Sequence, residues 1–458
     1  MAAEGVPHKS AALGALGLLA ALVLLEGCAS HSERTQPVRS ALDAGNPREA
    51  IALLNKEIDV PSDADLPPDM SSDHALFVLD RASVQQAAQQ FDRSKRDFEA
   101  ADKAIDMLDL AHDVSDTIGQ YVFSGSSGRY QAPPYEKLLI NTLDMLNYLE
   151  LRDLNGARIE ARRLAVMQRY VADELKEREN PVMGLGAMLA GFTFEKSDQV
   201  DEALRWYDQA LEFTGAGDLR DPVRLLRRRG QYRSPRLEEL GKGDDSASLR
   251  PLEEAGEGEI VVVIGYGRVP HKVAERVPIG LALTAYSDSI APGDVAAANR
   301  IAAQGLVTWI NFPTLGHERA GFESPSCTLD ATPVALGQAV DVTSQVRAEW
   351  KKIEGRVIAS AITRLVARYA AGTLAGAAAG KNDLVAALLS LGTQATLTVL
   401  DTPDTRSWET LPARVAVARV RVPAGKHTLR LVARGSVRSV EVDIDKGGWA
   451  VVSLMSLR

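Results

Sequence analysis

The residues of this chain that could perform chemistry do not form a known catalytic pattern. Gly265-Tyr266-Gly267 follows a predicted strand, as a dinucleotide-binding turn would, but no third glycine follows, and Pro270 lies where the phosphate-binding helix should begin. The seven histidines are scattered, without an H-E-x-x-H motif or a pair at the spacing of metal ligands. The segment 125–128, GSSG, lacks the register of a nucleophile elbow. We therefore predict no catalytic residue, no metal site and no cofactor.

Two polar and aromatic clusters remain as candidate recognition loops. The first follows the same predicted strand and contains Arg268, His271 and Lys272. The second lies late in the chain and contains Arg406 and Trp408, followed by Leu411-Pro412. Charged residues beside tryptophan and proline in a loop could form a binding edge. They could equally anchor the loops through hydrogen bonds and packing.

One residue type with an assignable role is cysteine, and the chain has only two. Cys28 follows an uncharged apolar run, 11–25, which is shorter than the roughly 20 residues that a membrane-spanning helix needs. Leu25-Glu26-Gly27-Cys28 resembles a bacterial lipobox, although Glu26 replaces the small or aliphatic residue usual there. The resemblance implies cleavage before Cys28 and attachment of acyl chains such as palmitate. The alternative is a buried N-terminal helix followed by an unrelated cysteine.

The lipobox resemblance also predicts a location. Stable anchoring needs more than one acyl chain, and a lipobox cysteine typically carries three. The next residue is Ala29 rather than aspartate, which by analogy with enteric sorting favours the periplasmic face of the outer membrane. Residues 1–27 are then the signal peptide and 28–36 the lipidated tether. Cys327 is left without an intramolecular partner, so we expect a buried thiol, with a bridge between chains as the alternative.

Composition limits the class of protein. The chain has 458 residues, of which 45% are hydrophobic and 25% charged, so two or three domains with ordinary cores are expected. The net charge of −9 argues against nucleic acid as a partner and provides no overall attraction to anionic lipid.

Residues 37–240 are predicted to be helical, because apolar residues recur at three- and four-residue steps. In 184–213, Gly191 and Phe194 precede a polar turn and then Ala203, Tyr207 and Ala210, which resembles a tetratricopeptide repeat. Weaker echoes recur irregularly rather than every 34 residues or so. An irregular tetratricopeptide-like array is therefore expected, with a generic helical bundle as the alternative. The aromatic residues of this stretch, among them Trp206, are interpreted as core rather than as ligand contacts.

The polar, glycine-rich segment 241–258 is the predicted linker to an α+β domain at 259–458. Its first strand, Glu259–Ile264, should be buried on both faces, since its Val/Ile run is continuous. Further strands are predicted at 279–285 and 306–312, and a long helix from Asp341 or Thr343 towards Gly372, Gly376 and Gly380. An antiparallel meander that pairs with the earlier strands into an α+β or sandwich-like domain is predicted at 415–422, 427–432, 437–444 and 449–454. The predicted fold class is thus α + β multidomain.

The order of these features resembles a known group. A lipobox, tetratricopeptide-like helices with Glu179-Asn180-Pro181, the strand before Gly267–Lys272, and Arg406-Ser407-Trp408 resemble bacterial tetratricopeptide-repeat-containing envelope lipoproteins of unassigned role. The resemblance implies an envelope protein. Some members are encoded near lipoprotein activators of penicillin-binding proteins, which hints at cell-wall synthesis.

The leading hypothesis is a non-enzymatic scaffold, anchored in the membrane by lipid, that binds an envelope protein partner. A sharper alternative is a regulator of peptidoglycan synthesis that contacts a synthase directly. A third hypothesis, from another class, is a carbohydrate-binding or hydrolytic C-terminal domain. The oligomeric state is left open, including any contribution of the Gly372-Gly376-Gly380 segment.

Overall fold

The computed structural model describes most of the chain and groups it into two compact units. The described residues are 29–70, 73–105, 130, 132–173, 180, 182–213, 219–242, 249–286, 292–303, 309–319, 324–378 and 403–458. One unit comprises 35–273, 314–357 and 406–458, and the other 1–34, 274–313 and 358–405. Cys28, the segment 125–128 and Gly380 lie outside the described residues. Among the described helices, none has both the length and the apolarity to cross a bilayer.

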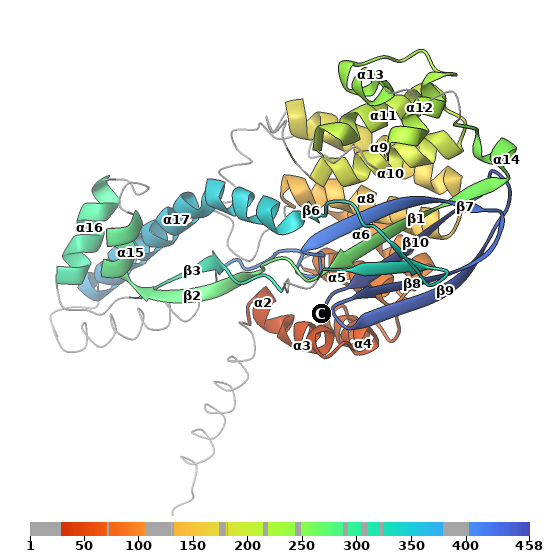
Figure 1. The fold of residues 1–458 in the computed structure, drawn as a ribbon. Helices are drawn as coiled ribbons and strands as arrows, with labels where there is room; N and C mark the ends of the chain where they lie inside the picture. Colours follow the sequence, from red (N-terminus) through yellow and green to blue (C-terminus); the bar gives the residue numbers. More distant parts are fainter. Residues whose placement is uncertain are drawn as a thin grey trace, which may run out of the picture. The chain divides into compact units, whose positions relative to one another are not determined.

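The helical part of the larger unit consists of consecutive helices that pack in pairs (Figure 1). The pairs are α3 (Gln36–Asp43) with α4 (Pro47–Glu57), α5 (His74–Ala87) with α6 (Phe91–Ala104), α8 (Pro134–Glu150) with α9 (Leu154–Asp173), and α10 (Val182–Lys196) with α11 (Val200–Phe213). Three short helices follow: α12 (Arg220–Arg227), α13 (Pro235–Gly241) and α14 (Leu252–Ala255). The predicted N-terminal helical region is thereby confirmed.

Small residues set the distance between helices within two of these pairs. A Cβ atom on Gly156 of α9 would lie 1.9 Å from the ring of Tyr148 in α8. A Cβ atom on Gly191 of α10 would lie 2.5 Å from the ring of Tyr207 in α11. Only glycine therefore permits these aromatic rings to fill the space between the helices.

Two four-stranded sheets complete the unit. In the first, the order is β10 (Trp449–Ser456), β1 (Glu257–Tyr266), β7 (Arg414–Pro423) and β6 (Val340–Asp341). β1 runs parallel to β10 and antiparallel to β7. In the second, the order is β5 (Thr332–Val334), β4 (Ser326–Leu329), β8 (Gly425–Ala433) and β9 (Ser436–Ile444).

The predicted C-terminal meander is wrong, because its four strands divide between the two sheets. Only β8 and β9 form a hairpin, whereas β7 and β10 flank β1. The reason lies in their apolar surfaces. β1 and β10 are buried along almost their whole length, and β7 along most of its first half, so they need cover on both faces. β9 alternates between partly buried and exposed residues and can leave one face in water.

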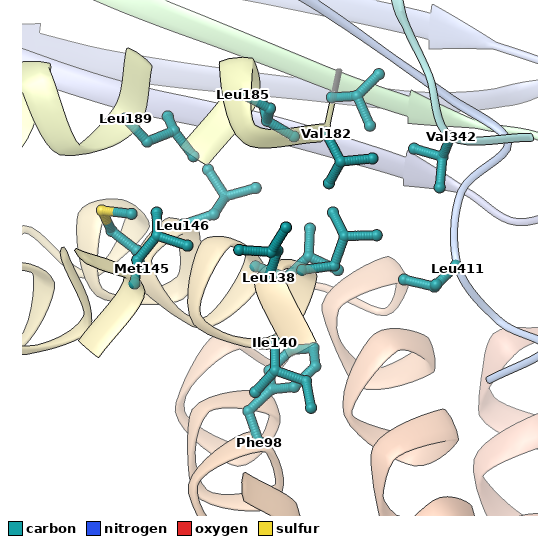
Figure 2. Packing of buried hydrophobic residues seen from close by; sticks show 14 of the residues in the cluster. Phe98, Leu138, Ile140, Met145, Leu146, Val182, Leu185, Leu189, Val342 and Leu411 are labelled. Atoms are coloured by element: carbon teal, nitrogen blue, oxygen red, sulfur yellow. The ribbon is translucent and has the colours of Figure 1, made fainter. Parts of the chain in front are cut away.

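Alternate residues of β1 contribute to two different cores, which confirms the prediction that this strand is buried on both faces. Ile260, Val262 and Ile264 pack with residues of the second sheet, so the two sheets form a sandwich. Val261 and Val263 pack in the same core as the helices. Figure 2 shows part of this helical core, where Leu411 and Val342 reach the residues of α8 and α10.

The predicted linker at 241–258 does not separate the two compact units. β1 already begins at Glu257, and the helices share a core with the sheet that this strand enters. Residues 37–240 and much of 259–458 therefore belong to one unit, because the apolar faces of the helices are covered by the strands.

The smaller unit contains α2 (His31–Arg34), α15 (Ile279–Tyr286), α16 (Pro292–Ala303) and the later part of α17 (Val342–Ala378). The strands β2 (Lys272–Pro278) and β3 (Trp309–Leu315) pair with each other, and most of both belongs to this unit. Its core includes Ile279, Ala282 and Leu283 with residues of α17. The strand predicted at 279–285 is wrong: burial at positions 279, 282 and 283 follows helical spacing.

The long helix predicted from Asp341 or Thr343 is confirmed as α17. The Oδ1 atom of Asp341 accepts a hydrogen bond of 3.0 Å from the backbone N–H of Ser344, which satisfies an otherwise unpaired donor of the first turn. Gly372 and Gly376 lie within this helix.

Candidate functional site

The tryptophan of the second candidate recognition loop is buried against the helices. Trp408 is 1% exposed, and its Nε1–H donates to the hydroxyl of Ser83 in α5 at 2.9 Å. Its backbone N–H donates to Glu136 of α8 at 3.1 Å. The ring meets Phe98 edge to face, with centroids 5.8 Å apart. Trp408 therefore joins three helices and is not available to a partner.

The residues beside Trp408 are held in the same way. Arg406 is buried, lies 3.6 Å from a carboxylate oxygen of Asp73 and stacks over the ring of Tyr130. The backbone N–H groups of Glu409 and Thr410 both donate to Oδ1 of Asp80 at 3.1 Å. Of the two alternatives left open by the sequence, the structure favours loop anchoring for Arg406 and Trp408.

Three buried carboxyl groups lie at this loop, Asp80 and Glu136 on the helices and Glu409 in the loop itself, and burial raises the pKa of each. The pKa of Asp80 is well above its usual value because of burial and the nearby Glu409. Burial raises the pKa of Glu409 to about 7, although the charge of Arg39 and a hydrogen bond from Thr35 oppose the rise. Burial also raises the pKa of Glu136, against hydrogen bonds from Tyr130 and the Trp408 backbone. Asp80 and Glu136 accept from backbone N–H groups of the loop, and Glu409 of the loop accepts from Thr35 and Arg39, so all three serve as anchoring groups.

Arg268 of the first candidate loop is also an anchor. Its guanidinium donates to Oδ1 of Asp43 at 2.7 Å and to the backbone carbonyl of Leu457, and the residue is 2% exposed. Burial together with the charges of Arg39, Arg268 and Arg319 lowers the pKa of His271 to about 4, so its imidazole is neutral at pH 7.

The structure brings the two candidate loops together. The backbone N–H of Val269 donates to the carbonyl of Leu411 at 3.1 Å, and that of Lys272 lies 3.5 Å from the hydroxyl of Ser407. Their adjacency depends on strand pairing far apart in the sequence and could not be predicted from local patterns. His271 and Lys272 are half-buried, and Arg268, Arg406 and Trp408 are buried.

Cys327 is a buried thiol, as predicted, and burial raises its pKa. Within the described parts of the chain, no group of histidine, cysteine and carboxylate side chains could hold a metal ion.

Two open hollows on the larger unit were not identified from the sequence. One, of about 360 Å³, lies between α9 and α11 and is lined by Ala165, Gln168, Arg169, Glu202, Arg205, Trp206 and Gln209. The other, of about 400 Å³, is lined by Asp43, Arg319, Arg434, Gly435 and Arg458. Each is lined by one aspartate or glutamate side chain, whereas most glycosidases use two. Trp206 was the only signal in the sequence for the hollow between α9 and α11. The hollow lined by Arg319, Arg434 and Arg458 gave no signal, because these arginines are far apart in the chain.

Comparison of the chain with protein-family models, with curated proteins and with solved structures found no match.

Proposed function

We propose that this protein is a lipid-anchored, non-enzymatic scaffold of the bacterial cell envelope, on the periplasmic face of the outer membrane. Its tetratricopeptide-like helical array binds an acidic, partly apolar segment of a protein partner in the hollow between α9 and α11. The observation that carries the proposal is a stripe of exposed apolar and basic side chains on α9 beside that hollow.

The stripe follows one face of α9. Ile159 and Val166 are each 50% exposed, which is high for large apolar residues. They are seven residues, or about two helical turns, apart and therefore lie on the same face. Arg162 and Arg169 are exposed on the same face, three residues after each of them. A face of this kind matches an amphipathic partner whose apolar residues meet Ile159 and Val166.

The charges beside the hollow favour an acidic partner. Among the residues that the structure describes, neither Arg162 nor Arg169 forms an ion pair with a carboxylate. Arg205 is paired at 3.0 Å with Glu202, but both side chains are about half exposed. An acidic segment would supply the missing complementary charge, which increases specificity and the rate of association.

The base of the hollow is held in shape by the two helices themselves. The side-chain amide of Gln209 in α11 donates to the side-chain carbonyl of Gln168 in α9 at 3.1 Å. Trp206 is largely buried and supplies an aromatic wall. Paired helices that stack side by side leave grooves of this kind, which repeat proteins use to bind extended segments.

A photoreactive residue at position 166 tests this proposal. We expect irradiation of intact cells to yield one discrete protein adduct, because the side chain at this position points into solvent beside the hollow. The charge reversal Arg169→Glu should abolish that adduct by repelling an acidic segment. The measurement is the adduct pattern on a denaturing gel, with mass spectrometry of the adduct.

The matched control is the same photoreactive residue at position 437. Val437 is also about half exposed, at 49%, but lies on β9 of the sandwich, away from α9. Identical adducts at positions 166 and 437, or an adduct at 166 that survives Arg169→Glu, would contradict the proposed binding surface.

The anchor has its own test. We expect mass spectrometry of the purified protein to find a peptide that begins at an acylated Cys28, in the outer-membrane fraction. Cys28→Ser should leave the signal segment uncleaved, because the thiol that accepts the lipid is absent. An unmodified Cys28 in the wild-type protein would remove the anchor from the proposal and leave the photocrosslinking result unaffected.

A further inference from the structure

We propose that the hollow between Arg319, Arg434 and Arg458 is a binding site for a phosphate group. This inference is independent of the α9–α11 surface, since none of the lining residues is shared. The ligand class is a phosphomonoester or inorganic phosphate, which both present a compact dianion with several acceptor oxygens.

The three arginines come from three separate segments of the larger unit. Arg319 follows β3, Arg434 lies in the turn between β8 and β9, and Arg458 follows β10. Their side chains line one open hollow of about 400 Å³. Guanidinium groups repel one another, so their gathering around a hollow favours an anion between them.

The guanidinium of Arg458 fills space that is available only because Gly45 and Gly435 have no Cβ atom. A Cβ atom on Gly45 would lie 2.7 Å from its Cζ atom, and a Cβ atom on Gly435 would lie 2.6 Å from one of its terminal nitrogens. Both glycines have positive φ, +77° and +75°, which favours glycine at these turns. The Nη2 atom donates to the carbonyl of Ala44 at 3.3 Å, so the charged group is held at the hollow rather than free in solvent.

The backbone at Arg434 is unusual for this residue type. It has a φ of +46° and precedes Gly435 in the hairpin turn. Turns with positive φ at both central residues prefer asparagine, aspartate or glycine at the first position. An arginine at this position indicates that its guanidinium is needed at the hollow.

Positive charges outnumber negative charges at the hollow. Asp43 is the acidic side chain of its lining, and that group already accepts from Arg268 at 2.7 Å and from Arg319 at 2.9 Å. The terminal carboxylate of Arg458 accepts from Nε of Arg434 at 2.9 Å. Among the described residues, no aspartate or glutamate side chain pairs with Arg434 or Arg458, so two carboxylates face the guanidinium groups of Arg268, Arg319, Arg434 and Arg458. The nearby His271 is kept neutral by burial and by surrounding arginines, in agreement with a positive potential.

Phosphate fits this arrangement better than a carboxylate does. A guanidinium has five N–H donors in a planar fork that pairs with two phosphate oxygens. The Nε–H of Arg434 donates to the terminal carboxylate of Arg458, and its two terminal nitrogens remain as donors for a ligand in the hollow. Several such forks around one group satisfy a dianion with more acceptor oxygens than a carboxylate has.

Calorimetric titration of the full mature protein with inorganic phosphate tests the site. We expect saturable binding, and a loss of affinity of about tenfold or more in Arg319→Gln and in Arg434→Gln, because each removes a charge-assisted contact. Arg319 is 61% exposed, so its replacement should not affect folding, and a thermal melt checks this. Arg430→Gln is the matched control. Arg430 is exposed on β8, the strand that leads into the turn at Arg434, but it does not line the hollow.

The outcomes separate the possible ligands. Phosphate binding that is weakened by both variants and not by Arg430→Gln supports the site. Sedimentation with vesicles of phosphatidylcholine plus phosphatidic acid, against phosphatidylcholine alone, then distinguishes a lipid phosphomonoester from free phosphate as the source. Absence of saturable phosphate binding, equal affinity for acetate, or unchanged affinity in both variants would overturn the proposal.

Discussion

Trp408→Ala is expected to lower the free energy of unfolding by about 3–5 kcal/mol, the usual cost of removing a large aromatic side chain from a core. The ring is 1% exposed and contacts Phe98 at its edge, so its removal leaves a cavity. The hydroxyl of Ser83, which accepts the indole N–H at 2.9 Å, also loses a partner. Chemical denaturation followed by circular dichroism measures the change, with the midpoint and slope fitted together.

Two further variants show whether the loss comes from anchoring of the loop. Trp408→Phe keeps much of the ring and removes the hydrogen bond to Ser83, so we expect a smaller loss, of about 1–2 kcal/mol. Trp449→Ala removes a tryptophan that is only partly buried, and its cost should be lower than that of Trp408→Ala. If Trp408→Ala costs no more than Trp449→Ala, the loop does not hold the helices as described.

Arg419→Met is expected to destabilise the protein by about 3–5 kcal/mol, because it leaves buried carboxylates without their main partner. Arg419 of β7 donates to Glu259 of β1 and to Glu195 of α10, both at 2.6 Å, and to the hydroxyl of Tyr207 at 2.8 Å. Although burial opposes ionisation of Glu195, the charges of Arg419 and Lys196 lower its pKa to about 2. The substitution therefore breaks the polar link between the helices and the first sheet.

Arg421→Met is the matched control for Arg419→Met. Arg421 lies two residues further along β7 and forms an ion pair of 2.8 Å with Glu257, but these side chains are 25% and 36% exposed. Water and salt screen such a pair, so its loss should cost about 1 kcal/mol or less. Adding Glu195→Gln to Arg419→Met should recover part of the loss, since it removes one uncompensated charge. Equal costs for the two arginines would contradict the role of the buried network.

Several features of this protein were determined by local sequence. The continuous Val/Ile run of β1 required a strand with both faces covered, and Asp341 predicted the start of α17, since both depend on residues adjacent in the chain. The recurring apolar residues of 37–240 predicted helices for the same reason. The prediction of export from Cys28 and the apolar run before it depends likewise on adjacent residues and is to be tested by mass spectrometry of the N-terminal peptide.

Other features were decided only by tertiary structure. Local pattern cannot say which strands become neighbours, so β7 and β10 were assigned to a meander although they flank β1. Ile279–Tyr286 is apolar enough for a strand, and it became a helix because α17 covers its residues at helical spacing. Trp408 resembled a recognition residue until Ser83 and Glu136, both far away in sequence, proved to be its partners. Arg319, Arg434 and Arg458 likewise meet only because distant segments fold together. The burial of a residue and the charges around it depend on its neighbours in space, which local sequence does not specify.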